Sequence, residues 1–121
     1  MTLEELTFEP LGNGVLARVA GEVDLSNAQS VRERLLAAVP NTASALVLDL
    51  SETEYMDSTG VRLIFELAER LRSRGQKLEI VVPGDSFVRR VLILTEVERV
   101  VPMSATVAEA GRGGEETTPA P

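Results

Sequence analysis

The chain of 121 residues contains neither cysteine nor histidine. These two absences exclude a Ser-His-Asp triad, a cysteine nucleophile, a zinc site built from Cys and His, and a histidine pH switch. A disulfide framework is excluded as well, so the chain does not fit the pattern of a small secreted domain.

Aromatic residues and positive charges are also scarce. Only 3% of the residues are aromatic, and 12 Lys and Arg stand against 19 Asp and Glu, which gives a net charge of -7. Nucleic-acid phosphates would be repelled on average, and few rings are available to stack on single-stranded bases. We therefore expect no nucleic-acid partner.

No signal peptide or membrane span is expected. The first five residues are acidic without a basic stretch, and the longest uncharged run, 35–48, is too short to span a bilayer and is broken by Pro40. These features predict a cytoplasmic protein without a membrane partner. One domain is predicted over residues 1–110. Residues 111–121 are rich in Gly, Pro, Glu and Thr and are predicted to form a disordered tail.

The hydrophobic pattern begins with two short strands, over 3–8 and 15–20, joined through turn residues 10–14 by a loop longer than two residues. Helices and strands then alternate: a helix from Ser26 or Asn27 to Val39, a strand over 45–50, a polar connection over 51–55, a helix over 58–74, a strand over 77–82, a short helix capped by Asp85 or Ser86, a weak strand over 97–101, and a last short helix from Ser104. This order predicts an α/β fold with a mixed, mostly parallel sheet of about five strands. An antiparallel hairpin opens it, and about four helices flank it.

Two loops run from the carboxyl ends of predicted strands into helix starts, where sites cluster in such folds. In the first loop, 21–27, Ser26 and Gln29 fit a capping box. The second loop, 51–60, ends in the sequence Asp-Ser-Thr-Gly.

Ser58 in this second loop has two interpretations. It can be an ordinary helix cap, a role that Asp57 could equally take. Alternatively, it can be a phosphorylated hydroxyl, because a helix N-terminus partly stabilises added negative charge. Thr59 is a second hydroxyl, and Gly60 would leave the backbone open to a partner. Tyr55 and the following Met56 could pack into the core or contact a partner.

Three segments carry a resemblance to a known family. Residues 46–60 (LVLDLSETEYMDSTG), 21–28 (GEVDLSNA) and 83–94 resemble STAS domains, and are most similar to the stand-alone bacterial anti-sigma factor antagonists. The match extends in order over about residues 3–110. A four-residue motif alone recurs by chance, whereas two loops inside the matching element order are specific.

The resemblance implies a regulatory switch. The unphosphorylated antagonist binds an anti-sigma factor that is also a serine kinase, and this releases the sigma factor for transcription. Phosphorylation of Ser58 breaks the complex, and a PP2C-type phosphatase restores it. No catalytic residue, cofactor or metal is implied. Eight further residues are expected to bind the partner: Asp24, Ser26, Asn27, Tyr55, Met56, Asp57, Thr59 and Gly60.

The sequence departs from the family pattern twice. Asn27 stands where Thr is common, and Glu96 stands where Gly usually ends the third helix. The first change could alter contacts, and the second leaves the end of that helix between Thr95 and Val97 undefined.

Enzyme classes fit the sequence less well. No Gly-x-Ser-x-Gly motif is present, and Lys77, the single lysine, lies outside any P-loop motif. Glu22 with Asp24, or Glu54 with Asp57, could be read as a Mg²⁺ pair, although solvated loop carboxylates are the simpler interpretation.

A response-regulator receiver domain also fits poorly, since Asp49 lies inside a strand pattern and residues 97–103 contain no lysine. Within the STAS superfamily, two alternatives stay open: a subunit of a lipid-transport ABC complex and a stressosome-type scaffold.

Overall fold

The computed structural model describes residues 4–110. Its elements follow in the order β1 (Glu4–Leu11), β2 (Gly14–Val23), α1 (Ala28–Ala37), β3 (Ala45–Asp49), β4 (Thr53–Met56), α2 (Ser58–Ser73), β5 (Lys77–Val81), α3 (Phe87–Leu94), the 3-10 helix η1 (Val97–Arg99) and β6 (Met103–Ser104). A further helical turn covers residues 107–110. The predicted α/β class is confirmed, with six strands where about five were expected. The predicted tail over 111–121 lies outside the described residues.

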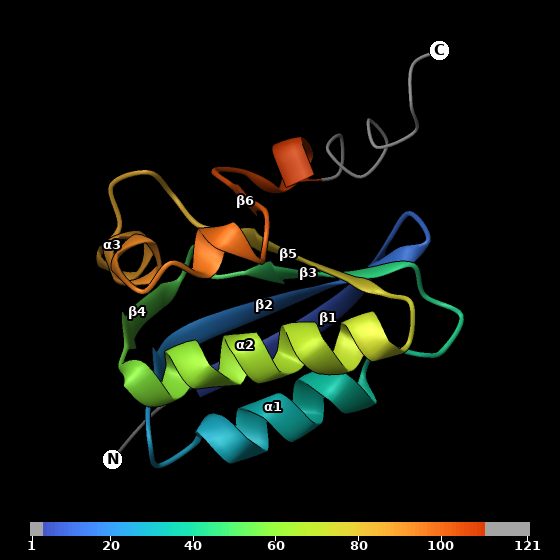
Figure 1. The fold of residues 1–121 in the computed structure, drawn as a ribbon, viewed down its shortest axis with the longest axis horizontal. Coiled ribbons are helices and arrows are strands. Elements are labelled where there is room, and N and C mark those ends of the chain that lie inside the picture. The colour runs from blue at the N-terminus through green and yellow to red at the C-terminus, as the bar shows by residue number, and fades with distance from the viewer. Residues whose placement is uncertain (1–3, 111–121) are drawn as a thin grey trace.

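The sheet is mixed and mostly parallel. Its strand order is β1-β2-β3-β5-β6, while β4 pairs with the far end of β2. Among the strand pairs within residues 4–110, only β1–β2 is antiparallel. Figure 1 shows α1 and α2 side by side across one face of the sheet, with α3 beside β4. None of the helices within residues 4–110 has the length and apolar character needed to cross a membrane.

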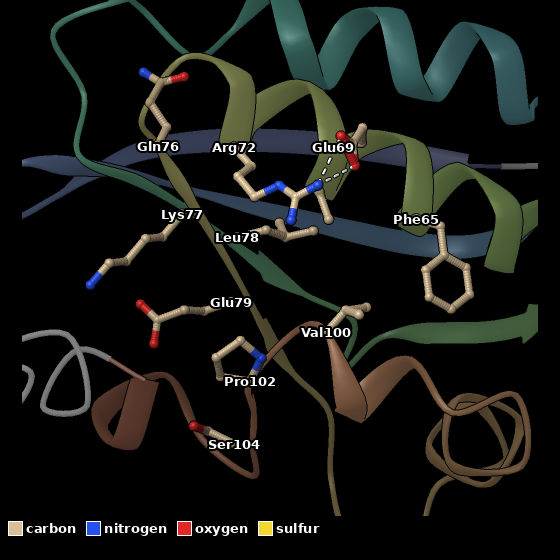
Figure 2. A pocket seen from close by; sticks show the side chains of 11 residues that line it. Phe65, Glu69, Arg72, Gln76, Lys77, Leu78, Glu79, Val100, Pro102 and Ser104 are labelled. Carbon is tan, nitrogen blue, oxygen red and sulfur yellow. Dashed lines mark hydrogen bonds and ion pairs between the residues drawn. The ribbon is translucent and has the colours of Figure 1, made fainter.

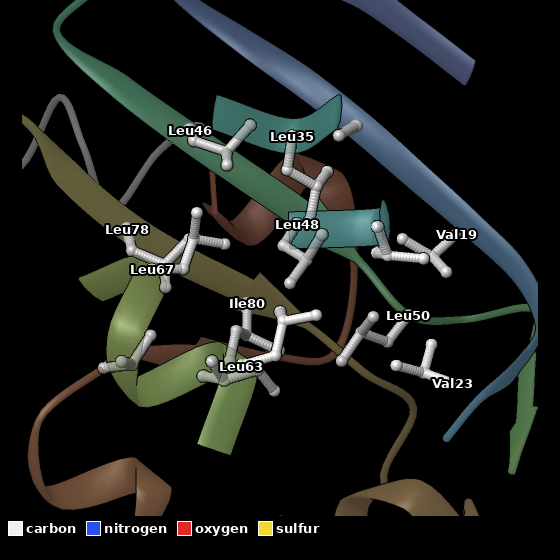
Figure 3. Close-up of a cluster of buried hydrophobic side chains, with 14 of the residues drawn as sticks. Val19, Val23, Leu35, Leu46, Leu48, Leu50, Leu63, Leu67, Leu78 and Ile80 are labelled. Carbon is white, nitrogen blue, oxygen red and sulfur yellow. The ribbon is translucent and has the colours of Figure 1, made fainter. Parts of the chain in front are cut away.

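An aliphatic core joins the two long helices to the sheet. Leu35 of α1 and Leu67 of α2 are fully buried against Leu48 and Ile80 of the central strands (Figure 3). Burying one such side chain contributes roughly 1.5–3 kcal/mol. The helical spacing on α2 and the continuous apolar run of β3 therefore both reflect burial against a common core.

All four aromatic residues reach the surface instead of this core. These residues are 36–49% exposed, and they are Phe8, Tyr55, Phe65 and Phe87. Stability thus rests on aliphatic packing, and the rings are available for other roles.

The polar connection predicted over 51–55 is wrong in part, because it contains most of β4. This short strand pairs with β2, and the hydroxyl of Thr53 adds a 2.7 Å hydrogen bond to the carbonyl of Val19. β2 also continues past its predicted end at residue 20. Its register shifts between Gly21 and Glu22, and Gly21 has φ 100°, which glycine adopts without strain.

The opening hairpin is tighter than predicted. Leu11 pairs with Gly14, so two residues, Gly12 and Asn13, connect β1 to β2. Gly12 has φ 57°, the left-handed conformation that two-residue hairpin turns require.

The strand predicted over 97–101 is also wrong. Val97 begins η1, and the N–H of Val101 donates to its carbonyl at 3.0 Å. Both valines are buried, at a spacing that suits a helical turn as well as a strand. Ser104, predicted to open the last helix, belongs to β6, and the helical turn begins at residue 107.

Candidate functional site

The two loops singled out by the sequence meet at the carboxyl ends of β2 and β4. Val23 and Met56 are register partners on these parallel strands. The N–H of Asp57 reaches back to the carbonyl of Val23 at 3.4 Å. Strand pairing therefore places the loop that follows β2 beside the start of α2.

The start of α2 is capped by Asp57. Its Oδ1 accepts hydrogen bonds from the backbone N–H groups of Thr59 at 2.9 Å and Gly60 at 3.2 Å. Ser58 is the first helical residue and is exposed, while Thr59 is half-buried. Of the two caps that the sequence allowed, the structure assigns the cap to Asp57. The hydroxyl of Ser58 is therefore not the group that caps the helix.

Met56 and Gly60 lie beneath this surface. Met56 is 3% exposed, so it packs into the core, which was one of its two predicted roles. A Cβ atom added at Gly60 would lie 2.5 Å from Met56 Cγ and 3.2 Å from Val23 Cγ1. Glycine at position 60 thus lets the first turn of α2 pack closely on two strands. The interpretation that it exposes backbone to a partner is wrong, because Gly60 is buried.

The loop after β2 is organised by Asp24. Its Oδ1 accepts hydrogen bonds from the Ser26 N–H at 2.9 Å and the Ser26 hydroxyl at 2.6 Å. Its carbonyl accepts the N–H of Ala28 at 2.9 Å. The predicted capping box between Ser26 and Gln29 is wrong, since α1 begins after Asn27. The Ser26 side chain instead bonds within its own loop.

Asn27 is the buried centre of the same loop, 7% exposed. Its amide nitrogen donates to Glu4 Oε1 at 2.9 Å and to the Glu22 carbonyl at 2.8 Å, while its Oδ1 accepts the N–H of Asp24 at 2.9 Å. A threonine hydroxyl has one donor hydrogen and cannot replace two. The departure of Asn27 from the family pattern therefore has a structural role in this chain.

An exposed aromatic pair joins β4 to α3. Tyr55 on β4 stacks on Phe87, the first residue of α3, with ring centroids 6.1 Å apart and planes inclined by 10°. The residues are 42% and 49% exposed. Tyr55 was predicted as a contact, whereas Phe87 was missed. The signal for Phe87 was the sequence FVRRVLIL of α3, which carries more apolar residues than one buried face needs.

The site therefore presents an exposed hydroxyl at a helix N-terminus, with the carboxylates of Asp57 and Asp24 on adjoining loops. The exposed ring of Tyr55 lies on β4, the strand that leads to this helix start. A positively polarised helix end stabilises added negative charge. Leu25, 80% exposed, adds an apolar side chain to the loop after β2. Within residues 4–110, no group of three acidic side chains is arranged to hold a metal ion.

A separate groove of about 530 Å³ runs between α2, β5 and the segment leading into β6 (Figure 2). Its lining includes Phe65, Leu78, Val100 and Pro102 but none of the predicted site residues. The candidate site is a surface, not this groove.

A family model and a curated relative identify the family of this chain. The model of the STAS domain matches residues 9–110. The anti-sigma-F factor antagonist RsfB of Mycobacterium tuberculosis is 30% identical over 103 residues, covering 84% of this chain and 82% of that protein. An anti-sigma factor antagonist structure from Mycobacterium paratuberculosis superimposes with TM-score 0.84 at 24% identity, covering 94% and 96%. The phosphorylated form of the Bacillus cell fate determinant SpoIIAA gives 0.63 at 19% identity, covering 88% and 96%. The two structural likenesses show a shared fold.

Proposed function

This chain belongs to the STAS domain family, and we propose that it is an anti-sigma factor antagonist switched by phosphorylation of Ser58. Unphosphorylated, it binds an anti-sigma factor that has serine kinase activity, and the sigma factor is released for transcription. Phosphorylation ends the complex, and a PP2C-type phosphatase renews it. The protein acts by binding in the cytoplasm and is not an enzyme.

The exposed hydroxyl of Ser58 carries this proposal. Because Asp57 caps α2, the Ser58 side chain is available to a kinase without loss of the cap. A phosphate at the first helical position also lies where the helix dipole favours negative charge. Phosphorylation is therefore compatible with an intact fold, as a reversible switch requires.

Charge explains how the modification would end binding. A phosphoserine carries roughly -1.5 to -2 charges at pH 7. These charges would join the carboxylate of Asp57 and, across the paired strand ends, that of Asp24. Closing an interface over this cluster would take several like charges out of water together, which is costly unless the partner supplies matching positive charge. The unphosphorylated surface avoids this cost.

The relatives support the class of partner. RsfB is named as an antagonist of an anti-sigma factor, and its match covers most of both chains. The Asp-Ser-Thr-Gly motif resembles that of the family, and this resemblance implies that Ser58 is the serine that is phosphorylated. The remaining surface residues, Asp24, Tyr55 and Thr59, would contact the partner, while Met56 and Asn27 would hold the two loops from beneath.

Phosphate mapping tests the proposal. Wild type, Ser58→Ala and Thr59→Ala are each incubated with ATP and, one at a time, the purified anti-sigma factors of the source organism, and phosphate is located by mass spectrometry. We expect phosphate on residue 58 in wild type and in Thr59→Ala, and none in Ser58→Ala. Phosphorylation of Ser58→Ala as efficient as that of wild type would show that the acceptor lies elsewhere.

A further inference from the structure

The backbone donors that follow Ser58 at the start of α2 are already in use. Asp57 Oδ1 accepts the N–H groups of Thr59 at 2.9 Å and Gly60 at 3.2 Å, and the Asp57 carbonyl accepts that of Val61 at 3.1 Å. A phosphate at a helix start ordinarily binds free N–H groups of this kind. A phosphate on Ser58 would therefore need a hydrogen-bond donor from another part of the surface.

Such a donor lies one helical turn further along α2, at Arg62. Ser58 and Arg62 are four residues apart in the same helix, and both are exposed. Residues at this spacing are neighbours on a helix surface, and helical side chains lean toward the N-terminus, so Arg62 leans toward Ser58. A guanidinium offers paired N–H groups that match two oxygens of one phosphate.

The guanidinium of Arg62 is not engaged elsewhere. None of the ion pairs formed within residues 4–110 includes it. Glu66, four residues further along the helix, is instead bound by Arg32 of α1 at 2.9 Å. A positive charge near a helix N-terminus opposes the helix dipole. The position of Arg62 is therefore unfavourable in the unphosphorylated protein and becomes favourable when Ser58 carries a phosphate.

We propose that Arg62 binds the phosphate of phosphoserine 58 and so stabilises the phosphorylated form of the protein. This inference rests on the proposed function, because it takes Ser58 as the phosphorylated residue. The contact would hold the phosphate against the surface of α2 while Asp57 keeps the helix cap. One guanidinium offsets only part of the roughly -1.5 to -2 charges of a phosphoserine. The surface still becomes more negative, as the switch requires.

The test uses the full chain with phosphoserine genetically encoded at position 58, so no kinase is needed. Arg62→Ala removes the proposed contact, and Arg62→Lys keeps the charge without the paired N–H groups. Arg70→Ala is the matched control, because Arg70 is an exposed arginine of the same helix, about 18 Å further along its axis. Phosphorus NMR titration measures the pKa of the phosphate. Thermal unfolding compares each protein with its unphosphorylated form.

A neighbouring guanidinium favours the doubly charged phosphate and lowers its second pKa, which is ordinarily about 6. We expect this pKa to be higher by about 0.3 or more in Arg62→Ala than without the substitution, intermediate in Arg62→Lys and unchanged in Arg70→Ala. Arg62→Ala should lower the melting temperature of the phosphorylated form. It should leave that of the unphosphorylated form equal or higher, because the cation there opposes the helix dipole.

The same phosphate pKa in all four proteins would overturn the inference and leave the proposed function standing. An equal loss of melting temperature in both forms of Arg62→Ala would also overturn it, because Arg62 would then have a structural role that does not depend on the phosphate. The proposed function fails separately. If phosphoserine 58 leaves the calorimetric affinity for the anti-sigma factors unchanged, the switch is contradicted even where the NMR titration shows the contact with Arg62.

Discussion

The carboxylate of Asp57 caps the helix that begins at Ser58. Its Oδ1 accepts the N–H groups of Thr59 and Gly60, while Ser58 is exposed at the first helical position. The residue that stabilises the helix start and the residue proposed to carry phosphate are thus neighbours with separate roles. Loss of the cap and loss of the proposed phosphate acceptor can therefore be tested with separate substitutions.

The first prediction follows from this separation. Asp57→Ala should lower the free energy of unfolding by about 1 kcal/mol, the usual effect of losing an N-cap. Ser58→Ala should lower it by much less, because the cap remains. Urea denaturation of the two variants measures both values. Equal losses would show that Ser58 contributes to the cap.

The second prediction concerns Gly60. Alanine favours a helix interior over glycine by about 1 kcal/mol, yet Gly60→Ala should destabilise by about 1–3 kcal/mol. The reason is the 2.5 Å approach between a new Cβ and Met56 Cγ. Thermal unfolding measures the change.

Gly84→Ala is the control for this prediction, since a Cβ there meets nothing within 4 Å and Gly84 does not have a positive φ. It should change stability by less than about 0.5 kcal/mol. The double variant Gly60→Ala with Met56→Ala should lose less than the sum of the single losses. A stabilised Gly60→Ala would contradict the packing described here.

The third prediction concerns Glu96, which stands where the family pattern usually has glycine. Glu96 has φ 63°, a left-handed conformation that costs a non-glycine residue roughly 1–2 kcal/mol. Glu96→Gly should therefore raise the free energy of unfolding by about 0.5–1 kcal/mol. The gain is reduced by loss of the exposed 2.6 Å ion pair with Arg99.

Glu98→Gly is the control, with an expected effect of opposite sign. Within residues 4–110, Glu96 is the one non-glycine residue with positive φ, so Glu98 gains nothing from the freedom of glycine. Chemical denaturation should show that Glu98→Gly loses stability. A loss in Glu96→Gly as large as that in Glu98→Gly would mean that the left-handed backbone costs nothing.

The fourth prediction is a pH dependence. Burial raises the pKa of the Glu79 carboxyl, and the charge of Lys77 opposes this in part. A raised folded-state pKa means that the folded protein prefers the proton, so stability falls as pH rises from the unfolded pKa through the folded one. Glu79→Gln should therefore raise the melting temperature at pH 7, and the difference should vanish near pH 3.

Glu5→Gln removes an exposed carboxylate of β1 and is the matched control. It should change the melting temperature less than Glu79→Gln does at pH 7. A melting temperature of Glu79→Gln below that of wild type at pH 7 would show that the charged carboxylate is stabilising.

Elements with one dominant apolar pattern could be predicted from the sequence. The five-residue strand β3 and the long helix α2 are examples, because each is buried over a continuous run or a clear stripe. The strand β4 was missed because it is defined by its pairing with β2 and by the buried Thr53 hydroxyl, which are long-range contacts that a local pattern does not reveal. The spacing of Val97 and Val101 suits a strand and a helical turn alike.

In the candidate site, too, local features could be predicted from the sequence and long-range contacts could not. The sequence located both loops, since strand ends and helix starts are visible in it. It could not choose between Asp57 and Ser58 as the cap, because both are good caps. It also missed Phe87, whose place beside Tyr55 depends on how α3 packs against β4.

The central claim is that a phosphate on Ser58 ends binding to the anti-sigma factor. The direct measurement compares calorimetric affinities of one purified anti-sigma factor for three proteins: unphosphorylated, carrying phosphoserine at position 58, and carrying phosphoserine at Ser73. Ser73 is exposed at the other end of α2, so it controls for charge alone. The account predicts a loss of affinity of at least about tenfold for phosphoserine 58 and almost none for phosphoserine 73. Equal affinities for all three proteins would contradict it.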